Sequence, residues 1–328
     1  YTMADNSKLE IFKLISKRYT FREVAISKCG LDEAQENDNQ IFNSLYGLFL
    51  QKLTQNEVWT HNRTKLGLVL FSSAGENVNE VFKAHSDACV IEGFIDGGPY
   101  DRIRRMSEKD DTTTTTLLDR NKIVTDRYYL YLYLPLNSHV GLMFLERKKG
   151  QDIHTPMELF LNEILKVRNN IHVERYVPQS IIEDFKDEGI IDSFTFTDTI
   201  VSPVLAGNAV EQQESHYDVS VSIKPHAGEA FGYNMLQDAL NSVGNVVVNF
   251  GNRVKSLSQF RTKKARIQRN NEGYNFSIGD DLKIRPMIEI ADEIHDRDND
   301  TLMRDQAYAM VNTLLGQIKD DIYPIQEE

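Results

Sequence analysis

The chain of 328 residues has few cysteines, a single tryptophan and no long hydrophobic run. Two cysteines, Cys29 and Cys89, cannot form a disulfide framework, and neither stands in a CxxC or CxxH spacing, so we expect reduced thiols in a reducing cytoplasm. The longest apolar runs fall short of the roughly 18 residues that cross a bilayer, so no membrane insertion is expected. The first residues lack the basic and apolar regions of a signal peptide, which also favours a cytoplasmic location.

Patterns typical of metal sites and nucleotide-binding loops are missing too. The eight histidines show no HxH, HxxxH or HxxEH spacing, and the acidic runs lack the glycine and terminal glutamate of an EF-hand. The glycine-rich residues Gly93–Gly98 have neither P-loop nor GxGxxG spacing and are interpreted as a loop, and no GxSxG is present. We therefore expect no metal, no cofactor and no catalytic residue of these kinds.

The composition is that of a globular protein with a sizeable core, since 41% of the residues are hydrophobic and 26% are charged. A chain of this length favours two domains. The composition and the order of predicted elements change near residue 176. We therefore predict an N-terminal domain over residues 1–176 and a C-terminal domain over residues 177–328. Helical and strand-like segments occur in both halves, which predicts an α+β fold with mainly antiparallel sheets packed with helices.

The first half is predicted to contain a β-hairpin followed by a helix. Tyr128–Leu134 and His139–Arg147 are rich in aromatic and aliphatic residues and flank a Pro-Leu-Asn-Ser turn, so Phe144 and Leu145 should be buried. Thr155 and the proline after it are typical of a helix start. The other elements predicted here are helices over Lys8–Lys17, Asp38–Leu53 and Val78–Ala88, a strand over Lys65–Ser72 and an exposed loop over Thr112–Thr116, for which an edge strand is the alternative.

The second half is predicted to be richer in strands and to end in a long helix. Its apolar stripe, repeated at helical spacing, is intramolecular core by default and a two-fold interface as the alternative, and Asp300 is the expected cap. The predicted elements are helices over Pro178–Gly189, Ala230–Val243, Pro286–His295 and Thr301–Ile322, and strands over Ser193–Ile200, Tyr217–Ile223, Val254–Gln268 and Tyr274–Ile278.

Charge is distributed unevenly along the chain. The formal net charge is −12, yet the segment Asn249–Asn271, called here the basic window, carries +7 and no acid, so the rest carries −19. An acidic protein is repelled on average by nucleic acid, whereas a local group of cations can neutralise phosphates. The candidate phosphate-binding residues are Arg253, Lys255, Arg261, Lys263, Lys264, Arg266 and Arg269.

Strand alternation divides the basic window into two faces. Lys264, Arg266 and Gln268 should share the solvent side of one strand, with the residues between them facing the core. The aromatic residues Phe260, Tyr274 and Phe276 could stack on bases. The competing interpretation is a solvated strand face without a ligand.

A metal-dependent nuclease is an alternative function. Glu146-Arg147-Lys148 follows an apolar strand, as the ExK element of some nucleases does. Such a site needs a second carboxylate to hold magnesium, and Asp126 precedes the neighbouring strand. Charged residues at strand ends are common, however, so solvation explains the same pattern.

Part of the chain resembles the RexA-type phage-exclusion proteins of lambdoid phages. The resemblance rests on Tyr217–Pro225 (YDVSVSIKP), on the following helix, basic strand and terminal helix, and on Gly141–Phe144 with the helix Met157–Leu165. It implies a bipartite fold, homodimerisation, and sequence-nonspecific binding of double-stranded DNA in an anti-phage role. It implies no catalytic residue.

These observations predict a DNA-binding protein of a phage-defence or phage-exclusion system, and they favour a protein that is not an enzyme. A metal-dependent nuclease in defence is the first alternative. The second is a non-enzymatic protein–protein interaction module, in which the acidic surface meets a basic partner such as a second defence-system protein.

Overall fold

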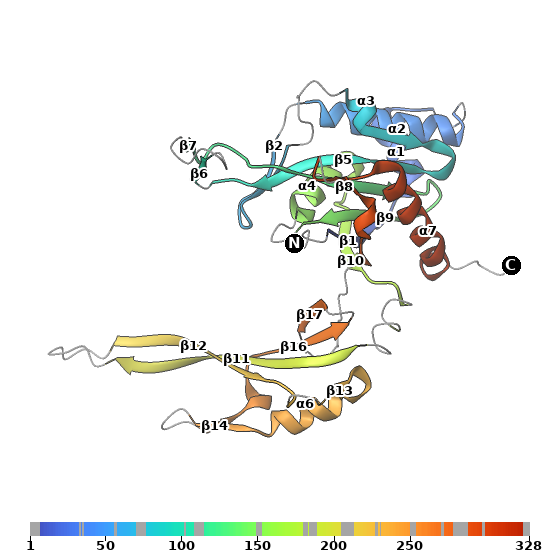
Figure 1. Ribbon diagram of the computed structural model, residues 1–328. Helices are drawn as coiled ribbons and strands as arrows, with labels where there is room; N and C mark the ends of the chain where they lie inside the picture. Colours follow the sequence, from blue (N-terminus) through green and yellow to red (C-terminus); the bar gives the residue numbers. More distant parts are fainter. Residues whose placement is uncertain are drawn as a thin grey trace. The chain divides into compact units, whose positions relative to one another are not determined.

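The computed structural model describes residues 7–32, 34, 36–55, 58–69, 77–101, 103–107, 115–148, 153–179, 183, 189–204, 213–226, 229, 231–249, 254–269, 272–277, 288–296 and 299–323. The chain divides into two compact units (Figure 1). The first unit joins Tyr1–Tyr176 to Met287–Glu328, and the second unit consists of Val177–Pro286. Both consist of antiparallel sheets packed with helices, which confirms the predicted α+β fold class.

The first unit is built on a nine-stranded antiparallel sheet. Its main strand order is β10-β1-β9-β8-β5-β3-β2, with β18 paired to β1 and β4 paired to β5. The strands are β1 (Lys8–Ile15), β2 (Val58–His61), β3 (Leu66–Val69), β4 (Phe82–His85), β5 (Val90–Pro99), β8 (Asp126–Tyr133), β9 (Val140–Arg147), β10 (His172–Tyr176) and β18 (Ile288–Glu289). A separate hairpin joins β6 (Arg104–Ser107) to β7 (Thr115–Leu118), and β19 (His295–Asp296) pairs with β20 (Thr301–Leu302).

Helices cover both faces of this sheet, so its central strands are apolar on both sides. The helices of the unit are α1 (Phe21–Cys29), α2 (Asp38–Leu53), α3 (Val78–Val81), α4 (His154–Leu165) and α7 (Arg304–Ile322). Residues of α1, α2 and α4 share one buried cluster with Phe12, Leu130 and Met143. Residues of α7 share the cluster on the other face with Tyr129 and Phe144. Figure 1 shows α1, α2 and α7 around the sheet.

The predicted hairpin is confirmed as β8 and β9. Leu130 pairs with Leu145 and Tyr133 with Leu142, and both Phe144 and Leu145 are buried as expected. The predicted helix Asp38–Leu53 is confirmed as α2, which begins with a capping box at Asn37. The helix expected after Thr155 is confirmed as α4, but Ile153 is its N-cap and His154 its first residue, so the prediction of Thr155 as the cap is wrong.

The helix predicted over Lys8–Lys17 is wrong, because this segment is the central strand β1. Leu9 and Ile11 face the α7 side of the sheet, whereas Phe12 and Leu14 face the side of α1 and α4. A strand buried on both faces carries apolar residues at adjacent positions, and these can imitate the i, i+3, i+4 spacing of a helix.

One further predicted helix is largely other structure, and one predicted loop is strand. Val78–Ala88 forms one helical turn, the edge strand β4 and a short 3-10 turn, since Phe82 pairs with Gly93 of β5. Gly93–Gly98, interpreted as a loop, is part of strand β5, and a Cβ at Gly93 would lie 2.4 Å from the carbonyl oxygen of Val81. The glycines of β5 therefore allow close approach of neighbouring backbone.

The observed structure also differs from the prediction near the end of the chain and at the threonine run. The described part of Pro286–His295 holds the two-residue strand β18 and a 3-10 turn instead of a helix. The terminal helix begins at Arg304 with Met303 as its N-cap, so Asp300 is not the cap. Of Thr112–Thr116, the described end belongs to β7, which agrees with the edge-strand alternative.

The terminal helix packs on the nine-stranded sheet of the first unit. Its apolar stripe is core, as the default interpretation expected, because Ala307, Val311, Leu315 and Ile318 are buried against the sheet. The predicted assignment of this helix to a C-terminal domain over residues 177–328 does not match this packing. The first unit is therefore formed by two separate stretches of chain.

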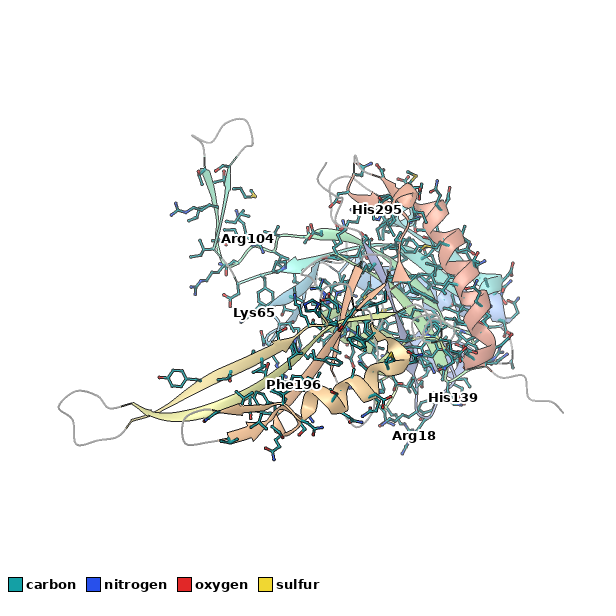
Figure 2. The ribbon with its side chains drawn as sticks, turned by 60° about the horizontal axis from the view of Figure 1, so that its bottom comes forward. Arg18, Lys65, Arg104, His139, Phe196 and His295 are labelled. Atoms are coloured by element: carbon teal, nitrogen blue, oxygen red, sulfur yellow. The ribbon has the colours of Figure 1, made fainter. Side chains whose placement is uncertain are left out.

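The second unit contains a five-stranded antiparallel sheet covered on one face. The strand order is β12-β11-β16-β17, with β13 also paired to β11, and β14 pairs with β15 in a separate ribbon. The elements are β11 (Ile190–Val204), β12 (Gln213–Ile223), β13 (Phe231–Gly232), α6 (Leu236–Gly244), β14 (Val247–Asn249), β15 (Val254–Ser256), β16 (Thr262–Arg269) and β17 (Glu272–Ser277). Phe196, which Figure 2 labels, is fully buried in the cluster that includes Leu236 of α6.

Most strands predicted in the second half are confirmed, with changes of length. Ser193–Ile200 and Tyr217–Ile223 lie within β11 and β12, but Val254–Gln268 is divided by a 3-10 turn into β15 and β16. The helix predicted over Ala230–Val243 begins only at Leu236. The helix predicted over Pro178–Gly189 lies almost entirely outside the described residues.

Two further observations concern the thiols and the helices. Cys29 and Cys89 are both free and half-buried, and burial raises the pKa of each thiol above its usual value. None of the helices in the described ranges has the length and apolar character needed to cross a membrane.

Candidate nucleic-acid interface

Strand β16 divides the basic window between two faces of the second sheet, as alternation predicted. Ala265 and Ile267 are buried under α6, which confirms the predicted core side. Lys264 and Arg266 are exposed on the opposite side of the strand. We call this side of the sheet the open face and define it by its exposed and half-exposed residues Thr195, Thr197, Ser220, Ser222, Lys264 and Arg266.

The open face is lined by hydroxyl groups at register positions next to the two cations. Lys264 pairs with Thr195 of β11, and Thr195 pairs with Ser222 of β12. One step along, the hydroxyls of Thr197 and Ser220 hydrogen-bond across the strands at 2.8 Å. Serine and threonine hydroxyls can donate to phosphate oxygens, so they suit a surface that follows a nucleic-acid backbone.

The charges of Lys264 and Arg266 are only lightly neutralised. The Nε atom of Arg266 lies 3.5 Å from Oδ2 of Asp192, and the two side chains are 52% and 33% exposed. An exposed ion pair contributes little free energy, so a phosphate can compete for this guanidinium. Within the described residues, Lys264 takes part in no ion pair. The exposed Asp218 lies on β12 four positions from Ser222, which is about 13 Å along the strand at the usual rise per residue.

Lys255 is held by an acid of its own unit. Its ammonium forms an ion pair with Asp198, a largely buried carboxylate that also accepts a hydrogen bond from the backbone N–H of Thr199 at 3.0 Å. The Lys255 ammonium holds the pKa of the Asp198 carboxyl below its usual value. Asp198 shares the α6 side of β11 with Phe196, so Lys255 is separated from the open face.

The remaining candidates are not brought together with Lys264. Lys263 pairs with Phe196 in register and therefore belongs to the covered side, while the exposed Arg261 precedes the strand. Arg253 and the side chain of Arg269 lie outside the described residues. The basic window thus concentrates two of its cations on one face.

The proposed stacking role of Phe260 is wrong. Its side chain is 3% exposed and packs edge-to-face against Phe196, with ring centroids 6.5 Å apart. The side chains of Tyr274 and Phe276 lie outside the described residues. Base stacking therefore has no observed support on this sheet.

The carboxylate pair of the nuclease alternative is not formed. Glu146 pairs with Leu9, which faces the α7 side of the sheet. Asp126 alternates along β8 with Tyr128 and Leu130, which face the other side. Opposite faces of a sheet cannot present two carboxylates to one ion, since metal–oxygen bonds are only about 2.0–2.6 Å long.

Glu146 is instead a buried structural carboxylate. It accepts hydrogen bonds from the Ser7 hydroxyl at 2.6 Å and from the backbone N–H of Tyr129 at 2.8 Å. Burial raises the pKa of Glu146 above its usual value, although these two bonds act in the opposite direction. Lys148, the last residue of the ExK element, pairs with Asp300 at 3.1 Å. Over the described ranges, no group of three or more His, Cys, Asp or Glu side chains is placed to hold a metal ion.

Sequence reasoning missed the hydroxyl lining of the open face. The alternation in β11 and β12 was visible, but a serine or threonine at an outward position carries no signal of its own. The register with β16 gives these hydroxyls a place beside Lys264, and that register is a tertiary property.

Comparisons with models of protein families, with characterised proteins and with solved structures find no match for the chain. The similarity to RexA-type proteins therefore stays a prediction, and the chemistry of the site has to be argued from its own residues.

Proposed function

We propose that this protein binds double-stranded DNA without sequence preference. The observation that carries the proposal is the open face, where Lys264 and Arg266 are exposed beside a row of hydroxyl groups. Lysine, arginine and hydroxyl groups are the side chains that contact phosphates, and phosphate contacts carry no sequence information. The ligand is held by its backbone charge.

The role that fits such binding is action in the cytoplasm against phage, as expected from the resemblance to the RexA-type family. Homodimerisation belongs to the same proposal, and light scattering over a range of micromolar concentrations tests it. A monomer mass that does not change with concentration would remove the dimer while leaving DNA binding untouched.

The test is a salt-dependent gel shift with duplex DNA and the double variant Lys264→Glu, Arg266→Glu. Each phosphate neutralised contributes about −0.9 to the slope of log affinity against log salt, so the variant should reduce this slope by about two. Affinity at low salt should fall by roughly one to three orders of magnitude. The matched control Arg120→Glu, Lys122→Glu makes the same change of charge at exposed positions of the first unit.

Equal binding by the Lys264/Arg266 variant and the control would show that the open face is not the contact surface. Adding magnesium to the same reactions separates binding from cleavage. Binding without cleavage supports the proposal, and magnesium-dependent cleavage would support the nuclease alternative with residues other than Asp126 and Glu146.

A protein–protein interaction module is the second candidate, and the β6–β7 hairpin favours it. Ile103 and Leu117 are 60% and 57% exposed on one face of this hairpin, and Met106 is 50% exposed on the other. Exposed apolar side chains of this kind often mark a contact with another protein. Arg104 of the same hairpin is labelled in Figure 2. Failure of duplex DNA to bind even at low salt would favour this candidate.

A further inference from the structure

In the part of the chain that the structure describes, the residues lining one cleft of the first unit are cations and amides. It lies between the segment that follows β1 and the segment that precedes β10, and its volume is about 560 Å³. The lining residues are Lys17, Arg18, Arg168, Asn169 and Asn170. We call this site the anion cleft. It shares no residue with the open face, which belongs to the second unit.

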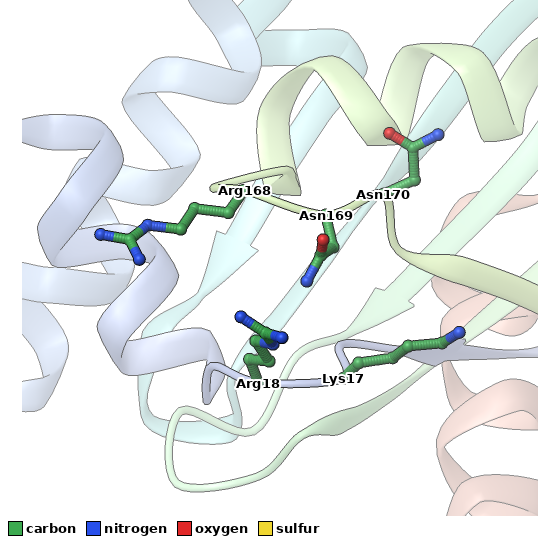
Figure 3. A pocket seen from close by; sticks show the side chains of 5 residues that line it. All are labelled: Lys17, Arg18, Arg168, Asn169 and Asn170. Carbon is green, nitrogen blue, oxygen red and sulfur yellow. The ribbon is translucent and has the colours of Figure 1, made fainter.

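The sheet brings the two segments together. Ile15, the last residue of β1, pairs with His172, the first residue of β10, so the residues just beyond this pair face one another. Figure 3 shows Arg18 and Asn169 pointing toward one another across the cleft, with Arg168 and Lys17 reaching to either side. The two segments are far apart in sequence, so no local sequence motif predicts the cleft.

Backbone hydrogen bonds hold both segments in place. The N–H of Ser16 donates to the carbonyl of His139 at 2.8 Å, and the N–H of Phe21 donates to the carbonyl of Ser138 at 3.0 Å. On the other side, the Asn162 side chain accepts a hydrogen bond from the N–H of Ile171 at 2.8 Å. A site fixed before its ligand arrives loses less entropy when the ligand binds.

The described residues supply no ion-pair partner for the cations of the cleft. In the described part of the chain, Lys17, Arg18 and Arg168 take part in no ion pair. The nearby acid Glu163 at the end of α4 pairs with Lys52 at 3.3 Å. Figure 3 shows Arg18 pointing into the cleft, with Lys17 and Arg168 extending to its two sides, so an anion in the cleft is attracted to this positive charge.

We propose that the anion cleft binds a small anion with two or more phosphoryl groups, such as a pyrophosphate moiety. Arginine presents a planar fork of donors that matches phosphate oxygens, and asparagine adds further N–H donors. None of the described lining residues is an aromatic or apolar residue that would recognise a base or an acyl chain. A long polyanion would continue beyond the cleft over a chain of net charge −12, whereas a compact anion stays among the cations.

Calorimetric titration of the full-length chain with pyrophosphate at low salt tests this proposal. We expect a Kd at or below about 1 mM, weakening as salt rises. Arg18→Gln with Arg168→Gln should weaken binding at least about tenfold, because hydrogen bonds to charged groups are the strong ones. Arg104→Gln with Arg105→Gln, on the β6–β7 hairpin, removes the same charge elsewhere and should leave binding unchanged.

Further arms separate the possible sources of the phosphate. ADP should bind no more than about tenfold tighter than pyrophosphate, because only the phosphates are contacted. Much tighter binding of ADP would mean that a base is recognised and would overturn the proposal. Arg18→Lys with Arg168→Lys keeps the charges and should retain measurable affinity, so a folding defect in the glutamine variant cannot hide the answer.

Two other results would also refute the anion cleft. One is no heat of binding with pyrophosphate at concentrations up to about 10 mM. The other is loss of duplex DNA binding in the Arg18/Arg168 glutamine variant without any pyrophosphate binding by the unaltered protein, which would make the cleft part of a nucleic-acid surface.

Discussion

Replacing Arg304 by methionine should leave a buried carboxylate without its main partner. The Nε atom of Arg304 lies 3.3 Å from Oε2 of Glu92, and the two side chains are 17% and 2% exposed. His85 lies 3.8 Å from the other carboxylate oxygen, but burial, aided by Lys83 and Arg304, lowers the pKa of its ring, so it carries little charge near neutral pH. Arg304 is therefore the principal cation facing Glu92, with the exposed Lys83 contributing from further away.

The expected loss of unfolding free energy is about 3 kcal/mol, the lower end of the range of roughly 3–5 kcal/mol for breaking a buried ion pair. Two structural facts place it there. Lys83 still attracts the Glu92 carboxylate, and Arg304 is not completely buried. Arg304 also donates to the backbone carbonyls of Glu80 and Val81, which adds about 1 kcal/mol per bond at most.

Urea unfolding followed by tryptophan fluorescence is the appropriate assay. The chain has one tryptophan, Trp59, which lies in β2 and packs against Phe160 with ring centroids 5.9 Å apart, so the signal reports on the first unit alone. Arg63→Met, at an exposed position after the same strand, is the matched control and should change stability by less than about 0.5 kcal/mol.

The pH dependence has a definite sign. Burial raises the pKa of Glu92, and removing Arg304 raises it further, so protonation in the folded state begins at a higher pH. The loss caused by Arg304→Met should therefore shrink as the pH falls from neutral toward the usual titration range of a carboxyl group, because the Glu92 carboxylate becomes neutral in the variant first. Glu92→Gln combined with Arg304→Met should recover most of the loss. A single variant within about 1 kcal/mol of the unaltered protein, or a double variant as unstable as the single one, would refute the reasoning.

Four other substitutions test the first unit by urea unfolding. Phe144→Ala should cost roughly 3–5 kcal/mol, because the ring is fully buried, and a loss under about 1 kcal/mol would contradict its place in the core. Gly93→Ala should lower the free energy of unfolding by about 1–3 kcal/mol, since the new Cβ meets the carbonyl oxygen of Val81. Gly47→Ala, within α2 where a Cβ meets open space, should raise the free energy of unfolding by about 0.5–1 kcal/mol. Glu146→Gln mimics the protonated carboxyl that burial favours, so its stability relative to the unaltered protein should increase as pH rises above about 4.5, and a flat difference would show that burial does not shift this pKa.

The elements predicted correctly are those whose pattern is set by local chemistry. The β8–β9 hairpin combines aromatic strands with a proline-containing turn, and α2 combines an apolar face with the cap at Asn37. In these segments the residues that define the ends lie next to the residues that define the period. Tertiary contacts therefore have little effect on the secondary structure of these segments.

The elements predicted wrongly depend on partners far along the chain. Lys8–Ile15 becomes a strand because β9 and β10 pair with it on both sides, and helices cover both of its faces. Val78–Ala88 keeps only one helical turn because β5 offers a free edge to Phe82–His85. A single-sequence pattern contains neither fact.

The candidate sites differ in the same way. The exposed pair Lys264 and Arg266 was predictable, since alternation along a strand assigns the faces from sequence alone. The ion pair that removes Lys255 from the candidate phosphate-binding residues was not predictable, because Lys255 and Asp198 come together only in the folded protein. The anion cleft left no sequence signal, as Arg18 and Arg168 are brought together by the pairing of β1 with β10.

The return of the chain to its first sheet has a consequence for synthesis on the ribosome. Residues 177–286 emerge and can fold before α7 exists, while the first sheet still lacks β18 and its second layer of helix. Until α7 leaves the exit tunnel, the aromatic face that carries Tyr129, Tyr131 and Phe144 is uncovered. Exposed apolar surface in a nascent chain promotes aggregation, so we expect the first unit to need chaperone protection, or fast completion of the chain, more than the second unit does.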